Sequence, residues 1–133
     1  MTEQKTPWRL INVPSFCDWR GTLSVLEKGL LPFSPKRCYW IHRIPIDAWR
    51  GRHAHKENDQ LLICMQGECK VLLCTEHRAQ QAEVHLRTPD EVLFIPRLVW
   101  HEIHGCTKET LLLLLASEEY DPQDYIQEQE RYL

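Results

Sequence analysis

Short segments rich in apolar and β-branched residues recur along the chain, separated at near-regular intervals by turn residues. Alternation of apolar and polar positions, as at 22–27, is typical of a half-buried strand. The segment 110–117 is almost continuously apolar, which indicates a strand covered on both faces. The pattern predicts about ten short strands, at 8–13, 22–27, 37–44, around 53–55, and at 60–65, 69–74, 83–87, 92–95, 99–104 and 110–117.

Turn signals and the C-terminal segment complete the predicted architecture. The turn 66–68, centred on a glycine, stands between two strands and predicts a hairpin. Asp121 is a good helix cap, Pro122 suits the first helical position, and apolar residues recur at helical spacing from Tyr125, so a short C-terminal helix is expected. Together these elements predict an all-β fold, a double-sheet jelly roll or β-barrel, whose mouth is a natural place for a ligand.

Length and charge narrow the function classes. A chain of 133 residues is expected to form a single domain, 1–133, that is large enough to bury a core. The formal net charge of -3 comes from mixed charges, with neither the basic footprint of a nucleic-acid-binding protein nor a polybasic membrane patch. Any anion-binding site must therefore be a local cluster of arginines.

The N-terminal residues and the cysteines indicate the compartment. Residues 1–7 are polar and lack the apolar core of a signal peptide, and the longest apolar run, 111–116, is too short to cross a bilayer. None of the six cysteines forms a Cys-x-x-Cys pair. We therefore expect reduced thiols and a cytoplasmic protein.

The first candidate for chemistry is the pair His53 and His55. In a strand, residues two apart lie on the same face, so both imidazoles are expected to point the same way. They follow two arginines, Arg50 and Arg52, which argues against a dry core at this place because buried charges need partners. The pattern favours a functional pair over the alternative, a solvated strand end.

The spacing of these histidines is similar to that of a cupin metal site. His-x-His is followed by Gln60 and Gly67, and a second motif runs from Pro96 to His101. A metal-binding cupin has glutamate where this chain has Gln60, and loss of that carboxylate removes the anionic ligand. The substitution favours a metal-free histidine site, although three histidines can still bind zinc.

Several longer stretches carry a more specific resemblance, namely 18–25, 32–41, 50–56, 99–102, 116–121 and 124–126. On these stretches the chain resembles the cupin-type sugar-nucleotide 3,4-ketoisomerases, which act on dTDP-4-keto-6-deoxy-D-glucose. The resemblance implies an isomerase with no metal and no cofactor, and a homodimer whose N-terminal strands cross to the partner. Trp40 and Arg52 depart from the usual residues of that family and bear on the sugar pocket.

The resemblance also implies residue roles in catalysis. His55 is expected to be the principal base and His53 its partner, because histidine takes and gives protons near neutral pH. Tyr39 is a candidate for proton shuttling, with packing inside its strand as the alternative.

Further residues are candidates for binding the substrate. Arg37 and Arg50 are expected to hold the diphosphate, for which the planar guanidinium fork is suited. Arg20 is a candidate for stabilising the negative charge on the sugar's enolate oxygen, which forms when a base removes the proton next to the ketone. Trp100 and His101 are expected to line the pocket, although a buried tryptophan is as often plain core. The combination of Arg20 and His101 resembles family members that form the galacto product, which would lead to a 3-amino sugar for surface polysaccharide.

Two other functions remain open from the sequence. The related 3,5-epimerases share the jelly roll and the nucleotide-linked substrate, and they typically pair a catalytic histidine with a carboxylate and a tyrosine. A non-enzymatic cupin module that binds a sugar nucleotide or a metal is the other alternative. If the chain is an epimerase, the hydrogen at C5 of the sugar should exchange with solvent. If it is a binding module, it should bind ligand without turnover.

Overall fold

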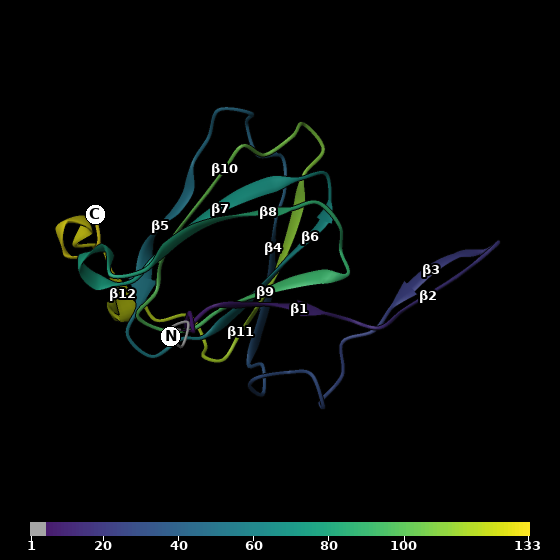
Figure 1. The fold of residues 1–133 in the computed structure, drawn as a ribbon, viewed down its shortest axis with the longest axis horizontal. Helices are drawn as coiled ribbons and strands as arrows, with labels where there is room; N and C mark the ends of the chain where they lie inside the picture. Colours follow the sequence, from purple (N-terminus) through teal and green to yellow (C-terminus); the bar gives the residue numbers. More distant parts are fainter. Residues whose placement is uncertain (1–4) are drawn as a thin grey trace.

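Two antiparallel sheets face each other in the computed structural model, which describes residues 5–133 (Figure 1). The first has five strands in the order β1-β9-β6-β11-β4, and the second has five in the order β12-β5-β10-β7-β8. The strands of the first sheet are β1 (Arg9–Asn12), β9 (Glu91–Ile95), β6 (Gln60–Gln66), β11 (Leu111–Ala116) and β4 (Arg37–Ile41). Those of the second are β12 (Tyr125–Ile126), β5 (Arg50–His55), β10 (Trp100–His104), β7 (Cys69–Cys74) and β8 (Gln81–Leu86).

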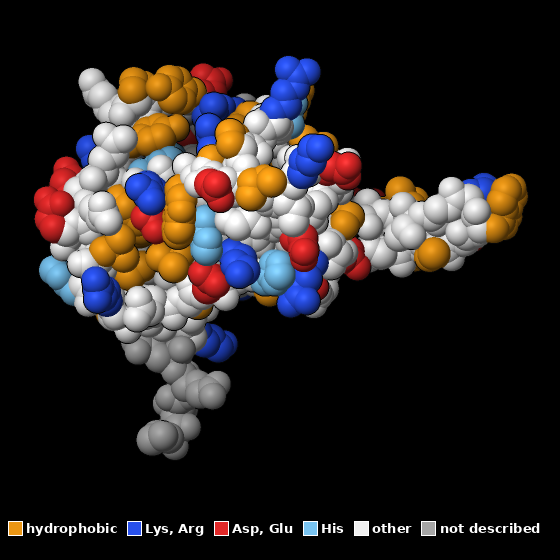
Figure 2. All heavy atoms as spheres, turned by 90° about the horizontal axis from the view of Figure 1, so that it is seen from above, with side chains coloured by type: hydrophobic (Ala, Val, Ile, Leu, Met, Phe, Trp, Pro, Cys, Tyr) orange, Lys and Arg blue, Asp and Glu red, His pale blue; other side chains and the backbone are white. Residues whose placement is uncertain are grey.

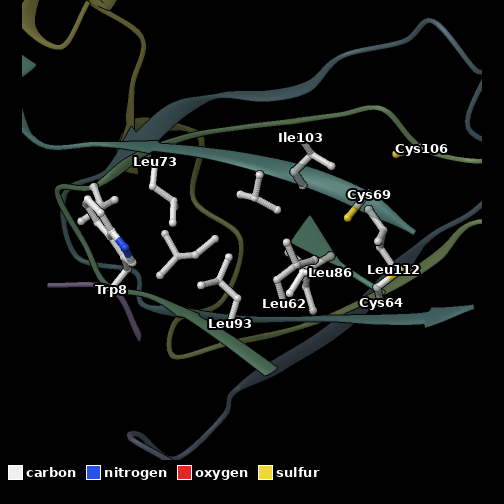
Figure 3. Packing of buried hydrophobic residues seen from close by; sticks show 14 of the residues in the cluster. Trp8, Leu62, Cys64, Cys69, Leu73, Leu86, Leu93, Ile103, Cys106 and Leu112 are labelled. Atoms are coloured by element: carbon white, nitrogen blue, oxygen red, sulfur yellow. The ribbon is translucent and has the colours of Figure 1, made fainter. Parts of the chain in front are cut away.

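The core lies between the inner faces of the two sheets, where branched aliphatic side chains interdigitate (Figure 3). Leu62, Leu93 and Leu112 come from the first sheet, and Leu73 and Leu86 come from the second; all are fully buried. Burying such side chains stabilises the fold by about 1.5–3 kcal/mol each. The predicted all-β jelly roll is confirmed by this packing.

Strand β11 shows why its sequence is almost entirely apolar. It lies between β6 and β4 in the first sheet. Leu112 and Leu114 face the core, whereas Leu113 and Leu115 pack on the outer face against Val13, Ile63 and other residues of a second cluster. Both faces of the strand are thus covered at least in part, as the sequence predicted.

The predicted hairpin at 66–68 is wrong, because β6 and β7 belong to different sheets and do not pair with each other. The turn instead carries the chain from one sheet to the other. Gly67 has a left-handed backbone with φ +77°, and a Cβ there would lie 2.6 Å from Oγ1 of Thr110. The glycine signal was therefore a turn signal, and it did not distinguish a hairpin from a corner between sheets.

The expected C-terminal helix takes the form of two short 3-10 turns, η2 (Pro122–Asp124) and η3 (Gln129–Arg131). Asp121 caps η2 as predicted, because its side chain accepts a hydrogen bond from the Gln123 backbone N–H at 2.9 Å. The turns are separated by β12, whose Tyr125 is paired with His55 on β5. Pairing with the edge of the second sheet satisfies backbone groups that an α-helix would have satisfied internally.

A two-stranded ribbon, β2 (Ser15–Asp18) and β3 (Gly21–Ser24), extends away from the sheets (Figures 1 and 2). The strand β3 overlaps the predicted strand 22–27, whereas β2 was not predicted. Phe16 and Leu23 are each 63% exposed on the ribbon, and Trp19 at its tip is 93% exposed. An isolated ribbon with exposed apolar side chains is marginally stable in water, so this arm is expected to lie against another surface.

Two further expectations from the sequence concern the cysteines and membrane-spanning segments. All six cysteines are free, and four of them are buried. Within residues 5–133, no helix has the length and apolar character needed to cross a membrane.

Candidate active site

An irregularity in strand β5 brings the candidate residues onto one face. His53 is paired with His101 on β10 and Arg50 with Ile103, so an extra residue of β5 interrupts the ladder. This is a β-bulge, and both Gly51 (φ +83°) and Arg52 (φ +63°) adopt left-handed conformations. Because of the extra residue, Arg50 and His53 face the same side of the sheet even though they are three residues apart.

The bulge also determines where Arg52 lies. Its guanidinium sits 5.1 Å from the centre of the Trp49 ring, and its Nε is 3.7 Å from Oε1 of Glu102. These contacts are outside the cavity described below. Arg52, one of the two departures from the family pattern, therefore does not line the pocket in this structure.

A cavity of about 380 Å³ opens between β4 of the first sheet and β5, β10 and β12 of the second. Arg37, Tyr39, Arg50, His53 and His101 line it, which brings together five of the eight residues selected from the sequence. The other lining residues include Ile41, His42, Ile103, Leu114 and Tyr125, together with part of Trp40. The cavity is thus lined by histidines, tyrosines and two arginines.

The side chain of His55 lies directly behind this wall. Only 5% of the residue is exposed. Its ring centre is 4.8 Å from that of His53 and 4.7 Å from that of Tyr125, with the His101 ring 6.0 Å away. His55 is therefore part of the same aromatic cluster, in contact with the groups that border the cavity.

Asp124 holds the His55 ring in place. Oδ2 of Asp124 accepts a hydrogen bond from Nδ1 of His55 at 3.1 Å. The carboxylate also accepts hydrogen bonds from the backbone N–H groups of Glu57 (2.8 Å) and Asn58 (3.3 Å). Since a carboxylate only accepts, Nδ1 of His55 carries the proton, and Nε2 is left as the basic nitrogen.

The other two histidines have the same tautomer by the same reasoning. Nδ1 of His53 donates to the Gly51 carbonyl at 3.0 Å, and Nδ1 of His101 makes a longer contact of 3.5 Å with the Val99 carbonyl. Each ring thus uses Nδ1 for a backbone acceptor and keeps a lone pair on Nε2. Nε2 of His55 is buried and has no hydrogen-bond partner.

The site keeps its histidines neutral. Burial, together with the neighbouring His55, lowers the pKa of His53 to about 4. Burial also lowers the pKa of His55, although the Asp124 carboxylate opposes this shift, and burial lowers the pKa of His101 well below its usual value. At neutral pH each imidazole is therefore able to accept a proton.

Tyr39 stands opposite the histidines, on β4. Its hydroxyl accepts a hydrogen bond from Nε2 of Gln60 at 2.8 Å, and burial raises its pKa to about 12. Its ring also supports Arg37, whose guanidinium lies 4.2 Å from the Tyr39 ring centre and 5.3 Å from that of Tyr120. Two aromatic faces thus orient one of the predicted phosphate-binding arginines.

Two predicted site residues are not part of this cluster. Trp100 is 1% exposed and stacks on Tyr132 at 5.3 Å, in a separate buried group on the other face of β10 from His101. Arg20 is in the turn between β2 and β3, where it pairs with Asp18 at 2.7 Å. Within one chain, Arg20 therefore does not reach the histidines.

A second cavity, of about 770 Å³, lies on another side of Asp124. Its lining is mainly acidic, with Lys36 as the cation, and includes Glu57, Glu118, Glu119, Tyr120 and Asp121. Carboxylates repel a diphosphate. The smaller cavity, which has the histidines and the arginines, is therefore the better candidate for a site that holds an anionic substrate.

Among residues 5–133, these three histidines form a group whose donor atoms lie close enough together to hold a metal ion. One ring nitrogen from each of His53, His55 and His101 lies within 4.8 Å of the others. Gln60, at the usual glutamate position, adds no carboxylate and is engaged with Tyr39. The donor set is thus three neutral nitrogens, which fits zinc better than magnesium or calcium.

Asp124 and Tyr125 were not selected from the sequence. Their segment was interpreted as the start of a helix, in which neither side chain would approach His55. The signal was nevertheless present, because 124–126 is one of the stretches that match the ketoisomerase family. Strand pairing between β12 and β5 places both residues against the histidines.

Comparison with known proteins identifies relatives along nearly the whole chain. The family model described as "FdtA: WxcM-like, C-terminal" matches residues 6–133. TDP-4-oxo-6-deoxy-alpha-D-glucose-3,4-oxoisomerase of Aneurinibacillus thermoaerophilus is 36% identical over 125 residues, which covers 93% of this chain and 88% of that protein.

Solved structures agree with this match. The sugar 3,4-ketoisomerase QdtA of Thermoanaerobacterium thermosaccharolyticum, in complex with TDP, superposes with a TM-score of 0.85 at 38% identity, covering 90% of this chain and 87% of that one. A dTDP-4-dehydrorhamnose 3,5-epimerase of Bacillus anthracis superposes with a TM-score of 0.79, covering 90% and 77%, but it is only 18% identical. The epimerase is thus similar in fold alone.

Proposed function

The chain belongs to the FdtA, WxcM-like family of sugar 3,4-ketoisomerases, and from this premise we propose that it converts dTDP-4-keto-6-deoxy-D-glucose into a dTDP-3-keto-6-deoxyhexose. The family makes the chain an isomerase, whereas the substrate and the product are the proposal. The observation that carries the proposal is the cavity itself, in which neutral imidazoles adjoin two arginines. Arg37 and Arg50 suit a diphosphate.

The proposed reaction moves a ketone between neighbouring carbons. The C4 carbonyl acidifies the proton on C3, and a neutral histidine removes it. The electrons of the C3–H bond move toward the C4 oxygen, which gives an enediolate. The proton on the C3 oxygen is transferred to the C4 oxygen, and protonation of C4 leaves the ketone at C3. Because one carbon is reduced as its neighbour is oxidised, no redox cofactor is needed.

Each residue has a proposed part in these transfers. His55 is the principal base, since Asp124 fixes its proton on Nδ1 and leaves Nε2 free. His53 borders the cavity and relays the oxygen-bound proton. Tyr39 faces them from the other sheet as a second candidate for this relay. Trp100 supports β10 from behind and does not contact substrate in this proposal.

We also propose that the active form is a homodimer with exchanged N-terminal ribbons. The ribbon carries exposed Phe16 and Trp19. The outer face of the first sheet offers apolar hollows, one of about 310 Å³ lined by Trp40, Met65 and Leu113 among others, and one of about 420 Å³ beside it. A second copy is the partner whose ribbon suits this face, and the exchange would deliver Arg20 to the neighbouring cavity.

The product's configuration and its use belong to the same proposal. Arg20 and His101 resemble the galacto-type members of the family, so we expect the C4 hydroxyl of the product to be axial. A 3-keto sugar is a substrate for transamination, which would give a 3-amino-3,6-dideoxy sugar for surface polysaccharide, made in the cytoplasm. The coupling between H4 and H5 in the product NMR spectrum, small for galacto and large for gluco, tests the configuration.

One observation favours the 3,5-epimerase as a second candidate. His55 pairs with a carboxylate and touches Tyr125, which is the combination typical of those enzymes. Incubation with dTDP-4-keto-6-deoxyglucose in deuterated water separates the two by NMR. We expect the ketone to migrate to C3. Deuterium at C5 without migration would establish the epimerase instead, and His55→Asn should abolish either reaction while dTDP binding persists.

A further inference from the structure

The three imidazoles of His53, His55 and His101 converge from two adjacent strands, and one nitrogen of each lies within 4.8 Å of the others. The side chains are held by different means: a backbone carbonyl for His53, a buried carboxylate for His55, and burial in the second sheet for His101. The convergence is therefore built into the fold and does not depend on a flexible surface side chain.

Metal binding by histidine requires a free lone pair, and the hydrogen bonds supply it. The Nδ1 atoms face the Gly51 carbonyl, the Asp124 carboxylate and the Val99 carbonyl, so the lone pairs are on Nε2. Nε2 of His55 is unpartnered although the residue is 95% buried, since 5% of its surface is exposed. A buried nitrogen without a partner is costly, and a ligand that binds it removes this cost.

The surroundings also suit an ion. A carboxylate behind a ligating histidine fixes the ring and raises its basicity, and Asp124 stands in that position behind His55. In a tetrahedral zinc site the nitrogens lie about 3.4 Å apart, so the rings, whose nitrogens lie within 4.8 Å of one another, would move closer together on binding. Two of the three rings, His53 and His101, line the cavity, which gives an ion a route to the cluster.

We propose that these three histidines bind one divalent transition-metal ion, such as Zn²⁺, and that the bound ion inhibits the enzyme. The ion takes the lone pairs on which proton removal depends, so the metal-bound protein has no free base. The binding step stands on the geometry alone, whereas the inhibitory step rests on the proposed function. A metal chelator is expected to restore the activity.

Binding is tested on chelator-treated protein by titration with Co²⁺, read from its visible absorption, and with Zn²⁺ by calorimetry. We expect one tetrahedral site per chain, without the near-ultraviolet thiolate band that a cysteine site would give. His101→Asn should weaken binding roughly tenfold or more, because it removes a ligand. His53→Asn serves as the second variant if His101→Asn does not fold.

The matched control is His85→Asn, which changes a histidine that pairs with Glu68 at 3.1 Å away from the cavity. It should bind Co²⁺ as the parent protein does. Equal binding by His101→Asn and the parent, or the absence of saturable binding, would overturn the proposal.

The inhibitory step has its own measurement. The initial rate should fall over the same range of Zn²⁺ concentration in which Zn²⁺ fills the site that the Co²⁺ spectrum reports. A higher substrate concentration should relieve the inhibition. Unchanged turnover at full occupancy would overturn this step and leave the isomerase assignment intact. An enzyme that is inactive after chelation and is restored by Zn²⁺ would overturn both inhibition and the metal-free reaction. Ketone migration, by contrast, is scored on metal-free protein, so the two proposals fail separately.

Discussion

Asp124 and His55 form a pair in which a buried carboxylate fixes the tautomer of a buried imidazole. Without the carboxylate, the ring is free to place its proton on either nitrogen. Asp124→Asn preserves the shape of the side chain but presents an amide that can turn either its oxygen or its NH2 group toward Nδ1. We therefore expect kcat to fall by about 10²–10⁴-fold, with little change in dTDP affinity, measured by steady-state kinetics and calorimetry.

The pH profile distinguishes this positioning role from a structural one. A parallel loss of dTDP binding and of thermal stability in Asp124→Asn would indicate that the carboxylate only supports the fold. A lower kcat with an altered pH profile and intact binding would indicate that it acts through His55. Asp121→Asn is the control, because Asp121 caps η2 in the same segment and does not contact the histidines.

The pKa shifts of the histidines predict how activity depends on pH. A base works in its neutral form, which dominates above its pKa. Burial lowers the pKa of His53 to about 4 and shifts that of His55 downward from 6.5. The acidic limb of kcat/KM should therefore lie below pH 6.5. A limb at or above that pH would mean that the catalytic base is less buried in the free enzyme than in this structure.

At the scale of elements, the bulge in β5 is the feature that assembles the cavity. Gly51 has φ +83°, and a Cβ at this position would lie 3.0 Å from the His101 carbonyl oxygen and 3.2 Å from Cδ2 of its ring. Gly51→Ala should lower the free energy of unfolding by roughly 1–3 kcal/mol and should also reduce activity, because it displaces His101. Thermal melts and kcat/KM measure the two effects.

Gly29→Ala is the matched control for this substitution. A Cβ at Gly29 would meet no atom within 4 Å, and the residue is exposed. We expect that variant to keep its stability and activity. Unchanged stability in Gly51→Ala would show that the bulge relaxes easily and does not hold His101 in place.

The elements differ in how far the sequence could predict them. Strands with clear alternation or apolar runs, such as β7 and β11, were predicted to within a residue or two, because period and burial are local properties. The partners of the strands were not predictable in this way. The turn at Gly67 is locally compatible with a hairpin and with a corner between sheets, and the outcome depends on the partners of β6 and β7, which lie in different sheets.

The C-terminal segment shows the same limit at the site. Pro122 and the Asp121 cap correctly predicted a helical turn, but the turn ends after three residues. The free edge of β5 then captures Tyr125 and Ile126. The histidines themselves could be selected from spacing and chemistry. The stretch 124–126 matched the family, but the contact of Asp124 with His55, 69 residues away in the chain, is set by the fold.

At the scale of the whole molecule, the position of Arg20 predicts active sites shared between chains. Arg20→Ala and His55→Asn should each be nearly inactive alone. If the ribbon of one chain completes the cavity of the other, mixed dimers contain one intact site and one doubly altered site. Random reassortment of the two variants should then restore about a quarter of the activity, since half of the dimers are mixed and half of their sites are intact.

Two measurements complete this prediction. Analytical ultracentrifugation should show a dimer, and removal of the apolar contacts by Trp19→Ser with Phe16→Ser should weaken it. Failure of the mixed sample to gain activity, with dimers present, would confine Arg20 to a role within its own chain or to none.

The extended ribbon has a consequence for the enzyme at low abundance. A reaction centre whose parts come from separate polypeptides exists only while those polypeptides are associated. Turnover per molecule should therefore decline on dilution. A copy altered at both Arg20 and His55 should silence a normal copy made in the same cell, because neither reaction centre of such a mixed pair would be complete.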